Sequence, residues 1–133
     1  HRGAIPEEQR ASLGAWLFGC DACQDVCPYN QGAGLSAHSP EAFGAGARWE
    51  GVEAADFLQM DESRFRAWAE GSPLKRAKDE GLARNAALVL GNRGDVAHLP
   101  VLNEAARHHR SGVVREAASW AHERLSRRLA EEE

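Results

Sequence analysis

The sequence predicts a mainly α-helical protein, and three observations support this prediction. From residue 61 onward, helix-capping residues alternate with glycine and proline breaks at the spacing of short helices. Apolar residues in this stretch recur at i, i+4, i+7 and i+8, as they do on the buried face of a helix. One such face occurs twice, because residues 81–87 and 112–118 align at an offset of 31 positions. We therefore expect helices that pack on one another.

The first expected helix begins at Pro6 and continues to Phe18, where Gly19 ends it. Proline suits the first helical turn because its missing N–H would have no helical partner there. Pro28 and the stretch 30–34 then predict irregular backbone. We expect residues 1–35 to form one cofactor-binding segment.

Residues 36–60 predict a connecting segment, because they are rich in glycine and alanine and contain Pro40. Three apolar residues are expected to hold this segment against the rest of the protein: Trp49, Phe57 and Leu58. The helical module is expected to occupy residues 61–133.

Four helices are expected in this module, and each has a recognisable beginning. The capping residues are Asp61, Ser72 (followed by Pro73), Asp95, and Ser111 or Gly112. Glycines are expected to end the first two helices, at Gly71 and in the stretch 91–94.

The repeated segment predicts which side chains are buried. The expected stripe is Leu82, Ala86, Val89 and Leu90 in the first copy, and Val113, Ala117, Trp120 and Ala121 in the second. Arg84 and Arg115 take equivalent places. A helix pair repeating at this length is typical of a HEAT-like solenoid. An ordinary helical bundle with chance internal similarity is the alternative.

Charge is unevenly distributed along the chain. The net charge of −4 argues against a general nucleic-acid binder. Basic residues nevertheless gather between residues 63 and 93: Arg64, Arg66, Lys75, Arg76, Lys78, Arg84 and Arg93.

No stretch approaches the roughly 20 apolar residues that cross a bilayer, and the N-terminus does not resemble a signal peptide. We expect no membrane partner, and we expect the chain, which opens without Met, to be part of a longer protein.

All three cysteines fall within eight residues, in the run Cys20-Asp-Ala-Cys23-Gln-Asp-Val-Cys27-Pro28. Such clustering predicts metal chemistry in a reducing compartment such as the cytoplasm, since disulfide frameworks spread paired cysteines along a chain. The spacing matches the end of the bacterial ferredoxin signature, whose last cysteine ligates a second cluster. We therefore expect a ferredoxin-like segment in which Cys20 and Cys23 bind one cluster and Cys27 binds another.

The number of ligands limits this prediction. Two [4Fe–4S] clusters take four thiolates each, so the remaining five would have to come from upstream. One alternative is a zinc site formed by the three cysteines and a histidine such as His38. Inert buried cysteines are another. The Cys-Pro ending and the lack of a second ligand pair favour iron–sulfur clusters.

Two stretches of the sequence resemble the epoxyqueuosine reductase family. The first comprises His1-Arg-Gly-Ala-Ile-Pro-Glu-Glu8 and Phe18-Gly-Cys-Asp-Ala-Cys-Gln-Asp-Val-Cys-Pro28. The second runs from Phe65 to Asp95 and includes Gly71-Ser-Pro-Leu-Lys-Arg-Ala-Lys78 and Gly81-Leu-Ala-Arg-Asn-Ala86. Tyr29 stands where the family usually has Trp, and Trp68 replaces a usual Phe. Neither departure removes a cysteine, while residues 33–51 have no recognisable counterpart.

The resemblance implies the C-terminal part of a cytoplasmic bacterial enzyme that reduces epoxyqueuosine to queuosine in tRNA, with cobalamin and two [4Fe–4S] clusters. It implies that Cys20 and Cys23 ligate the cluster farther from cobalamin and that Cys27 completes the nearer one. Cys20 and Asp21 would border the cobalamin. The catalytic acid and most of the cobalamin pocket would lie upstream, so no catalytic residue is expected here and the piece alone would be inactive. The expected partners are tRNA, the upstream domain and an electron donor, in a monomer.

The candidate RNA contacts are His1, Lys75, Arg76, Lys78 and Arg84. Point charges on a helical face can hold phosphates without reading bases. The alternatives are a solvated polar face for the lysines and arginines, and a frayed terminus for His1. The four tryptophans are expected to serve packing rather than base stacking.

Two other classes of function remain open on the sequence. One is an electron-transfer ferredoxin fused to a helical repeat scaffold. The other is a HEAT-like adaptor whose cysteines bind zinc.

Overall fold

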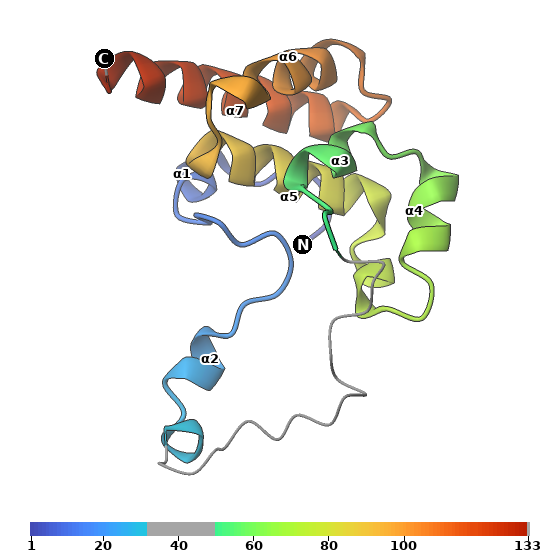
Figure 1. Ribbon diagram of the computed structural model, residues 1–133, viewed down its shortest axis with the longest axis vertical. Coiled ribbons are helices and arrows are strands. Elements are labelled where there is room, and N and C mark those ends of the chain that lie inside the picture. Colours follow the sequence, from blue (N-terminus) through green and yellow to red (C-terminus); the bar gives the residue numbers. More distant parts are fainter. Residues whose placement is uncertain (32–49, 133) are drawn as a thin grey trace. The chain divides into compact units, whose positions relative to one another are not determined.

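The computed structural model describes residues 1–31 and 50–132, and within these ranges all regular structure is helical (Figure 1). The α-helices are α1 (Glu7–Arg10), α2 (Ala22–Asp25), α3 (Ala54–Gln59), α4 (Glu62–Trp68), α5 (Lys78–Arg93), α6 (Leu99–His108) and α7 (Gly112–Glu131). Short 3₁₀ turns lie at Pro28–Asn30, Pro73–Arg76 and Val96–His98. The predicted mainly α class is confirmed. No helix in the described ranges is long and apolar enough to cross a membrane.

The chain divides into two compact units. The helical unit comprises His1–Phe18 with Glu53–Glu133, and the cysteine unit comprises Gly19–Val52. The predicted modules at 1–35, 36–60 and 61–133 stay a prediction. Of the residues expected to hold the connecting segment, Phe57 and Leu58 are buried in α3, and Trp49 lies outside the described residues.

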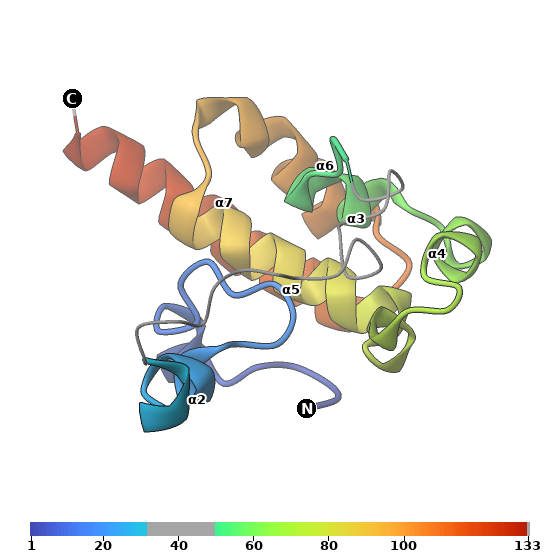
Figure 2. The same cartoon turned by 60° about the horizontal axis from the view of Figure 1, so that its bottom comes forward.

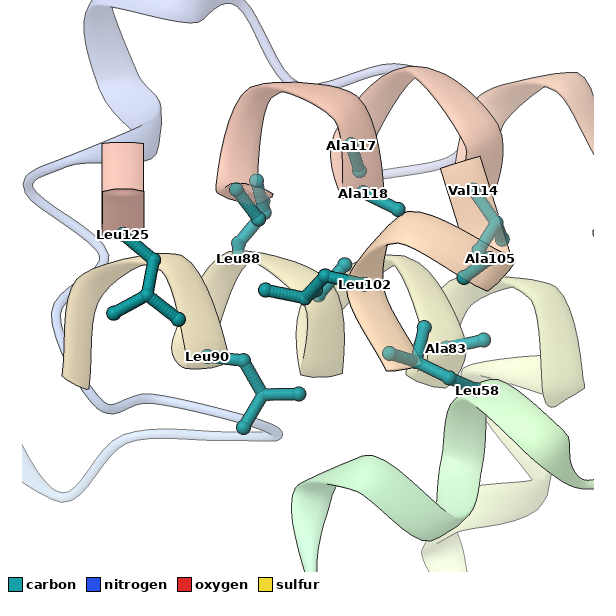
Figure 3. Close-up of a cluster of buried hydrophobic side chains, with 12 residues drawn as sticks. Leu58, Ala83, Leu88, Leu90, Leu102, Ala105, Val114, Ala117, Ala118 and Leu125 are labelled. Atoms are coloured by element: carbon teal, nitrogen blue, oxygen red, sulfur yellow. The ribbon is translucent and has the colours of Figure 1, made fainter. Parts of the chain in front are cut away.

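Helix α5 is the centre of the helical unit. It packs mainly on α7, which also contacts α6, and α3 packs on α5 (Figure 2). The largest fully buried side chains come from these helices: Leu82, Leu88, Leu102, Leu125 and Val114. Many of the core side chains from the four helices are drawn together in Figure 3. The two copies of the internal repeat lie in α5 and α7, so the two helices that contain them pack against each other.

The predicted stripe on α5 is partly wrong. Leu82, Ala86 and Leu90 are buried, but Val89 is only half-buried, whereas Leu88 is 1% exposed. The cause is the position of the helix, which has neighbours on several sides and therefore buries more than one face.

The expected break at residues 91–94 is also displaced, because α5 continues through Arg93. Gly91 serves a close helix crossing, not a turn: a Cβ atom there would lie 2.7 Å from the Cα of Ala121 in α7. The carbonyl of Asn92, near the end of α5, accepts a 2.9 Å hydrogen bond from Arg128 in α7. The end of α5 is thus fixed by α7.

The stripe predicted for α7 is shifted on the helix surface. Ala117 and Ala121 are buried as expected, but Val113 and Trp120 are only half-buried. The buried face instead consists of Val114, Ala117, Ala118, Ala121 and Leu125. Trp120 lies at the edge of the core, where its ring centroid is 5.9 Å from the Arg10 guanidinium and 5.5 Å from that of Arg124.

The helix predicted from Pro6 to Phe18 is wrong beyond its first turn. Helix α1 ends at Arg10, and turns follow. The carbonyls of Arg10 and Gly14 accept hydrogen bonds from the Asn92 side chain at 2.9 and 3.2 Å. Gly14 has a φ of +56°, a conformation that glycine adopts at low cost. The residues after α1 therefore form turns that bind to α5, and they do not continue the α1 helix.

The predicted caps are confirmed. Asp61, Ser72, Asp95 and Ser111 each accept a backbone N–H through the side chain. Ser72 and Asp95 cap 3₁₀ turns, and α5 and α6 begin only after these turns.

Candidate metal centre and basic pocket

The three cysteines lie around one short helix. Gly19, with a φ of +69°, turns the chain before Cys20, and Cys23 lies within α2. Cys27 precedes the 3₁₀ turn Pro28–Asn30, and its N–H donates to the Gln24 carbonyl at 3.2 Å. Proline at the first position of that turn ends the preceding α2 hydrogen-bond pattern. The loop thus places three thiols on a compact stretch of turns.

All three thiols are free, with Cys20 and Cys23 exposed and Cys27 half-buried. In the described ranges, no three Cys, His, Asp or Glu side chains gather into a group that could hold a metal ion. The donor chemistry fits iron–sulfur ligation, with further thiolates needed to complete each cluster. His38, the alternative zinc ligand, lies outside the described residues.

The cysteine loop is held by local polar contacts. The Asn30 amide donates to the Gln24 carbonyl and side-chain oxygen at 3.2 and 2.6 Å, and Gln31 donates to the Asp25 carbonyl at 2.7 Å. The carbonyl of Asp21 accepts from the N–H groups of Gln24 and Asp25 at 2.7 and 2.8 Å. Neither α2 nor the following 3₁₀ turn contributes a buried residue.

Three of the five candidate RNA contacts meet at one pocket of the helical unit. His1, Lys78 and Arg84 line a cavity of about 90 Å³, together with Arg2, Gly3, Ala77, Glu80 and Gly81. Lys78 is exposed and has a φ of +58°, which is uncommon for a residue with a side chain. The His1 ring makes a 2.9 Å hydrogen bond with the Ala4 carbonyl.

The other two candidates lie on the 3₁₀ turn before α5. Lys75 donates to the Glu70 carboxylate at 2.7 Å, and both side chains are substantially exposed. Arg76 is exposed. Lys75 and Lys78 also line a second hollow of about 420 Å³, formed with Glu62, Phe65, Arg66 and Asp79.

Arg84 differs from the other basic candidates because it is buried, with 5% of its surface exposed. Its guanidinium donates to the Gly3 carbonyl at 2.5 Å and to the Asn85 side-chain oxygen at 2.8 and 3.0 Å. Burial lowers the pKa of Arg84, and the nearby Glu80 carboxylate opposes that shift. Most of the donors of Arg84 are therefore already used within the chain.

Sequence reasoning did not identify the polar side chains that fasten residues 1–18 to the helices. Asn85 donates to the Leu17 carbonyl at 2.9 Å, and Asn92 holds the turns after α1. Arg10 is buried, pairs with Glu116 and donates to the Ile5 carbonyl at 2.8 Å. The only signal in the sequence was the presence of two asparagines in the largely apolar stretch 82–92, and it gave no indication of their partners.

Comparison with known proteins identifies relatives of both units. The family described as a 4Fe-4S double cluster binding domain matches residues 1–30. The epoxyqueuosine reductase of Xanthomonas campestris is 37% identical over 121 residues, and that of Pseudomonas aeruginosa is 39% identical over 123 residues. Each alignment includes 91% of this chain, and 34% and 33% of the respective relative.

Solved structures agree with the sequence comparison. Epoxyqueuosine reductase from Bacillus subtilis matches with a TM-score of 0.78 at 29% identity, over 94% of this chain and 33% of that one. A crystal structure of epoxyqueuosine reductase with an epoxyqueuosine-modified tRNA stem loop matches with a TM-score of 0.74 at 28% identity, over the same shares. The chain thus spans about a third of the length of these relatives. Sequence and fold together show that it is related to epoxyqueuosine reductases over that third.

Proposed function

We propose that this chain is the C-terminal part of an epoxyqueuosine reductase, an oxidoreductase that converts epoxyqueuosine to queuosine in tRNA. The observation that carries the proposal is the run Cys20-x₂-Cys23-x₃-Cys27-Pro28, which lies within the match to a double-cluster family. The rest of the chain shares its fold with solved reductases. Most of the catalytic machinery would lie in the part of the enzyme that this chain does not span.

In this proposal the chain contributes thiolate ligands to two [4Fe–4S] clusters. Cys20 and Cys23 ligate one cluster and Cys27 ligates the other, as the ferredoxin-type spacing predicts. The absence of a three-ligand group among the described residues is compatible with ligands divided between two centres. When bound, the clusters supply single electrons to the reduction. The exposed thiols of Cys20 and Cys23 leave room for ligands from elsewhere in the enzyme.

The same loop would border a cobalamin through Cys20 and Asp21, with the upstream domain forming the rest of that pocket. The Asp21 carbonyl is already occupied by two N–H groups of α2. Its side chain makes no capping hydrogen bond to that helix, so the carboxylate is available to a bound group.

The basic residues near the start of α5 would hold tRNA phosphates. Four of these residues are exposed: His1, Lys75, Arg76 and Lys78. Arg84 would act indirectly, because its hydrogen bonds to the carbonyls of His1 and Gly3 hold the N-terminus in place. The structural relative with a modified tRNA stem loop supports tRNA as the substrate. Lysine and arginine charges position a phosphate backbone, and base recognition would belong to other parts of the enzyme.

The finer assignments complete the proposal. We infer a ferredoxin-like segment at 1–35, a connecting segment at 36–60 and HEAT-like repeats at 61–133, in a monomer. Free cysteines suit a reducing compartment, which supports a cytoplasmic enzyme served by a separate electron donor.

Metal analysis and turnover of the full-length protein, purified without oxygen, test the proposal. We expect iron and cobalt together, with conversion of epoxyqueuosine to queuosine in tRNA observed by mass spectrometry. Iron without cobalt and without conversion would indicate a ferredoxin-type electron carrier instead. Zinc in place of iron would indicate an adaptor.

A salt titration tests the tRNA face separately. Replacing two basic side chains with Lys75→Ala and Arg76→Ala should lower the salt slope of tRNA binding, by roughly 0.7 to 0.9 for each phosphate that is no longer neutralised. The matched control is Arg107→Ala with Arg127→Ala, which removes two exposed charges from α6 and α7. An equal salt slope in both double variants would show that Lys75 and Arg76 belong to an ordinary solvated face.

A further inference from the structure

Two adjacent polar residues of α5 form a continuous set of hydrogen bonds to the N-terminal segment. Arg84 donates to the carbonyls of His1 and Gly3 at 3.4 and 2.5 Å. Its Nε and Nη2 atoms both donate to the Asn85 side-chain oxygen, at 3.0 and 2.8 Å. The Asn85 amide nitrogen then donates to the Leu17 carbonyl at 2.9 Å. Arg84 and Asn85 thus connect two points of the segment that are far apart in sequence.

The geometry fixes which way the Asn85 amide faces. An amide side chain can rotate to exchange its oxygen and nitrogen, but two donors from Arg84 hold the oxygen on their side. The nitrogen must then face the Leu17 carbonyl. A planar guanidinium held in a buried site makes this arrangement more rigid than a single exposed hydrogen bond.

Leu17 lies three residues before Cys20 along the chain. Three residues of extended backbone span at most about 11 Å, so a fixed Leu17 restricts where the first cysteine can go. Phe18 is partly exposed and Gly19 has a positive φ, so the intervening residues add little restraint of their own. The last firm attachment before the cysteines is therefore the bond from Asn85.

We propose that Asn85, oriented by Arg84, is a positioning residue for the cysteine loop: it fixes the backbone at Leu17 and so restricts the placement of Cys20. The inference rests on the proposed iron–sulfur function. The part of the inference in which Asn85 fixes the backbone at Leu17 does not require a bound cluster, because the hydrogen bonds join residues of the helical unit alone.

The test compares Asn85→Asp with Asn103→Asp in the full-length protein. Aspartate at 85 keeps an acceptor for Arg84 but removes the donor to Leu17, whereas Asn103 is an exposed residue of α6. In the cluster-free protein, we expect amide hydrogen exchange of residues 11–18 to rise about two- to tenfold in Asn85→Asp, as expected when one hydrogen bond is removed. The Trp16 amide, which donates to the Leu13 carbonyl at 3.1 Å, is the most informative site.

In the cluster-loaded protein, Asn85→Asp should shift the midpoint potential and the paramagnetic resonance spectrum of the cluster bound by Cys20 and Cys23. Asn103→Asp should leave both unchanged. Asn85→Ser, which also lacks the amide donor, repeats the measurement if the aspartate variant does not fold, as judged by circular dichroism.

Unchanged exchange in a folded Asn85 variant would overturn the inference, and so would faster exchange with an unaltered cluster signature. A wild-type protein that binds no iron–sulfur cluster would instead refute the proposed function, and with it the role toward Cys20. The exchange measurement would still decide whether Asn85 holds Leu17.

Discussion

The two units of the chain are ordered in different ways. In the helical unit, Leu88 and Leu102 are at most 1% exposed and belong to one core cluster with side chains from α3 and α7. In the cysteine unit, no residue of α2 is buried, and Val26 and Tyr29 are 73% and 90% exposed. Burial of apolar surface is the main favourable term in folding, so the helices have their own source of stability. The described part of the cysteine loop relies on short-range hydrogen bonds and on whatever binds its thiols.

This difference separates two kinds of mutation. A change in the helical core should alter the free energy of unfolding whether or not a cluster is bound. A change in the loop should alter cofactor binding and leave the stability of the helices nearly unchanged.

The largest effect is expected at Leu88, which the predicted stripe omitted. Leu88→Ala removes a buried side chain and leaves a cavity, so it should cost about 2–5 kcal/mol in denaturant unfolding of the chain. Val96→Ala is the control, because Val96 is 67% exposed and should change stability by less than about 0.5 kcal/mol. Equal costs at the two sites would contradict the assignment of α5 as the centre of the core.

An intermediate effect is expected at the crossing of α5 and α7. Gly91→Ala places a Cβ 2.7 Å from the Cα of Ala121, so the helices must move apart at a cost of about 1–3 kcal/mol. Gly81→Ala in the same helix meets only the Ala77 Cβ at 3.9 Å. It should stabilise the chain by about 0.4–1 kcal/mol, because alanine loses less backbone entropy. Thermal unfolding of both variants measures whether each change lowers or raises stability. A gain in stability for Gly91→Ala would refute the close crossing of α5 and α7.

The smallest effect concerns pH. Burial lowers the pKa of His109 from its usual 6.5, and the Arg115 charge acts in the same direction against the opposing Glu80. The unfolded chain therefore takes up a proton at this site more readily than the folded one. The contribution of His109 to stability should be fully present above pH 6.5 and should decline as the pH falls below that value. It should be lost once the pH is below the pKa of His109 in the folded chain.

Replacing the histidine isolates that contribution. His109→Gln should reduce the loss of stability between neutral and mildly acidic pH, while His108→Gln, at the exposed neighbouring position, should keep it. Melting temperatures at a series of pH values provide the measurement. Identical pH profiles for the two variants would show that His109 titrates alike in the folded and unfolded chains.

The capping residues could be predicted because a cap is a local interaction. Asp61, Asp95 and Ser111 bond to N–H groups two or three residues away, so the sequence contains both partners. The buried faces were predicted less well, since they depend on which neighbours a helix meets. Periodicity identified Leu82 and Ala121 but not Leu88, because only the assembled fold shows that α5 has partners on several sides.

The attachments of residues 1–18 could not be predicted for a related reason. Asn85 and Leu17 are 68 positions apart, and Asn92 and Arg10 are 82 positions apart. No local pattern links an amide to a distant carbonyl. In the candidate site, the cysteine spacing was readable because one short stretch contains the whole signal. The burial of Arg84 could not be predicted, because the sequence does not distinguish it from the neighbouring exposed basic residues.

The three cysteines are expected to serve two different clusters. The most direct measurement is the iron content and paramagnetic resonance spectrum of full-length protein with Cys20→Ser, Cys23→Ser or Cys27→Ser, purified without oxygen. Each variant should lose roughly half of its iron, since two [4Fe–4S] clusters are present. Cys20→Ser and Cys23→Ser should lose the same cluster and Cys27→Ser the other, while helical unfolding stays unchanged. Loss of one and the same cluster in all three variants would contradict the division of the three cysteines between two clusters.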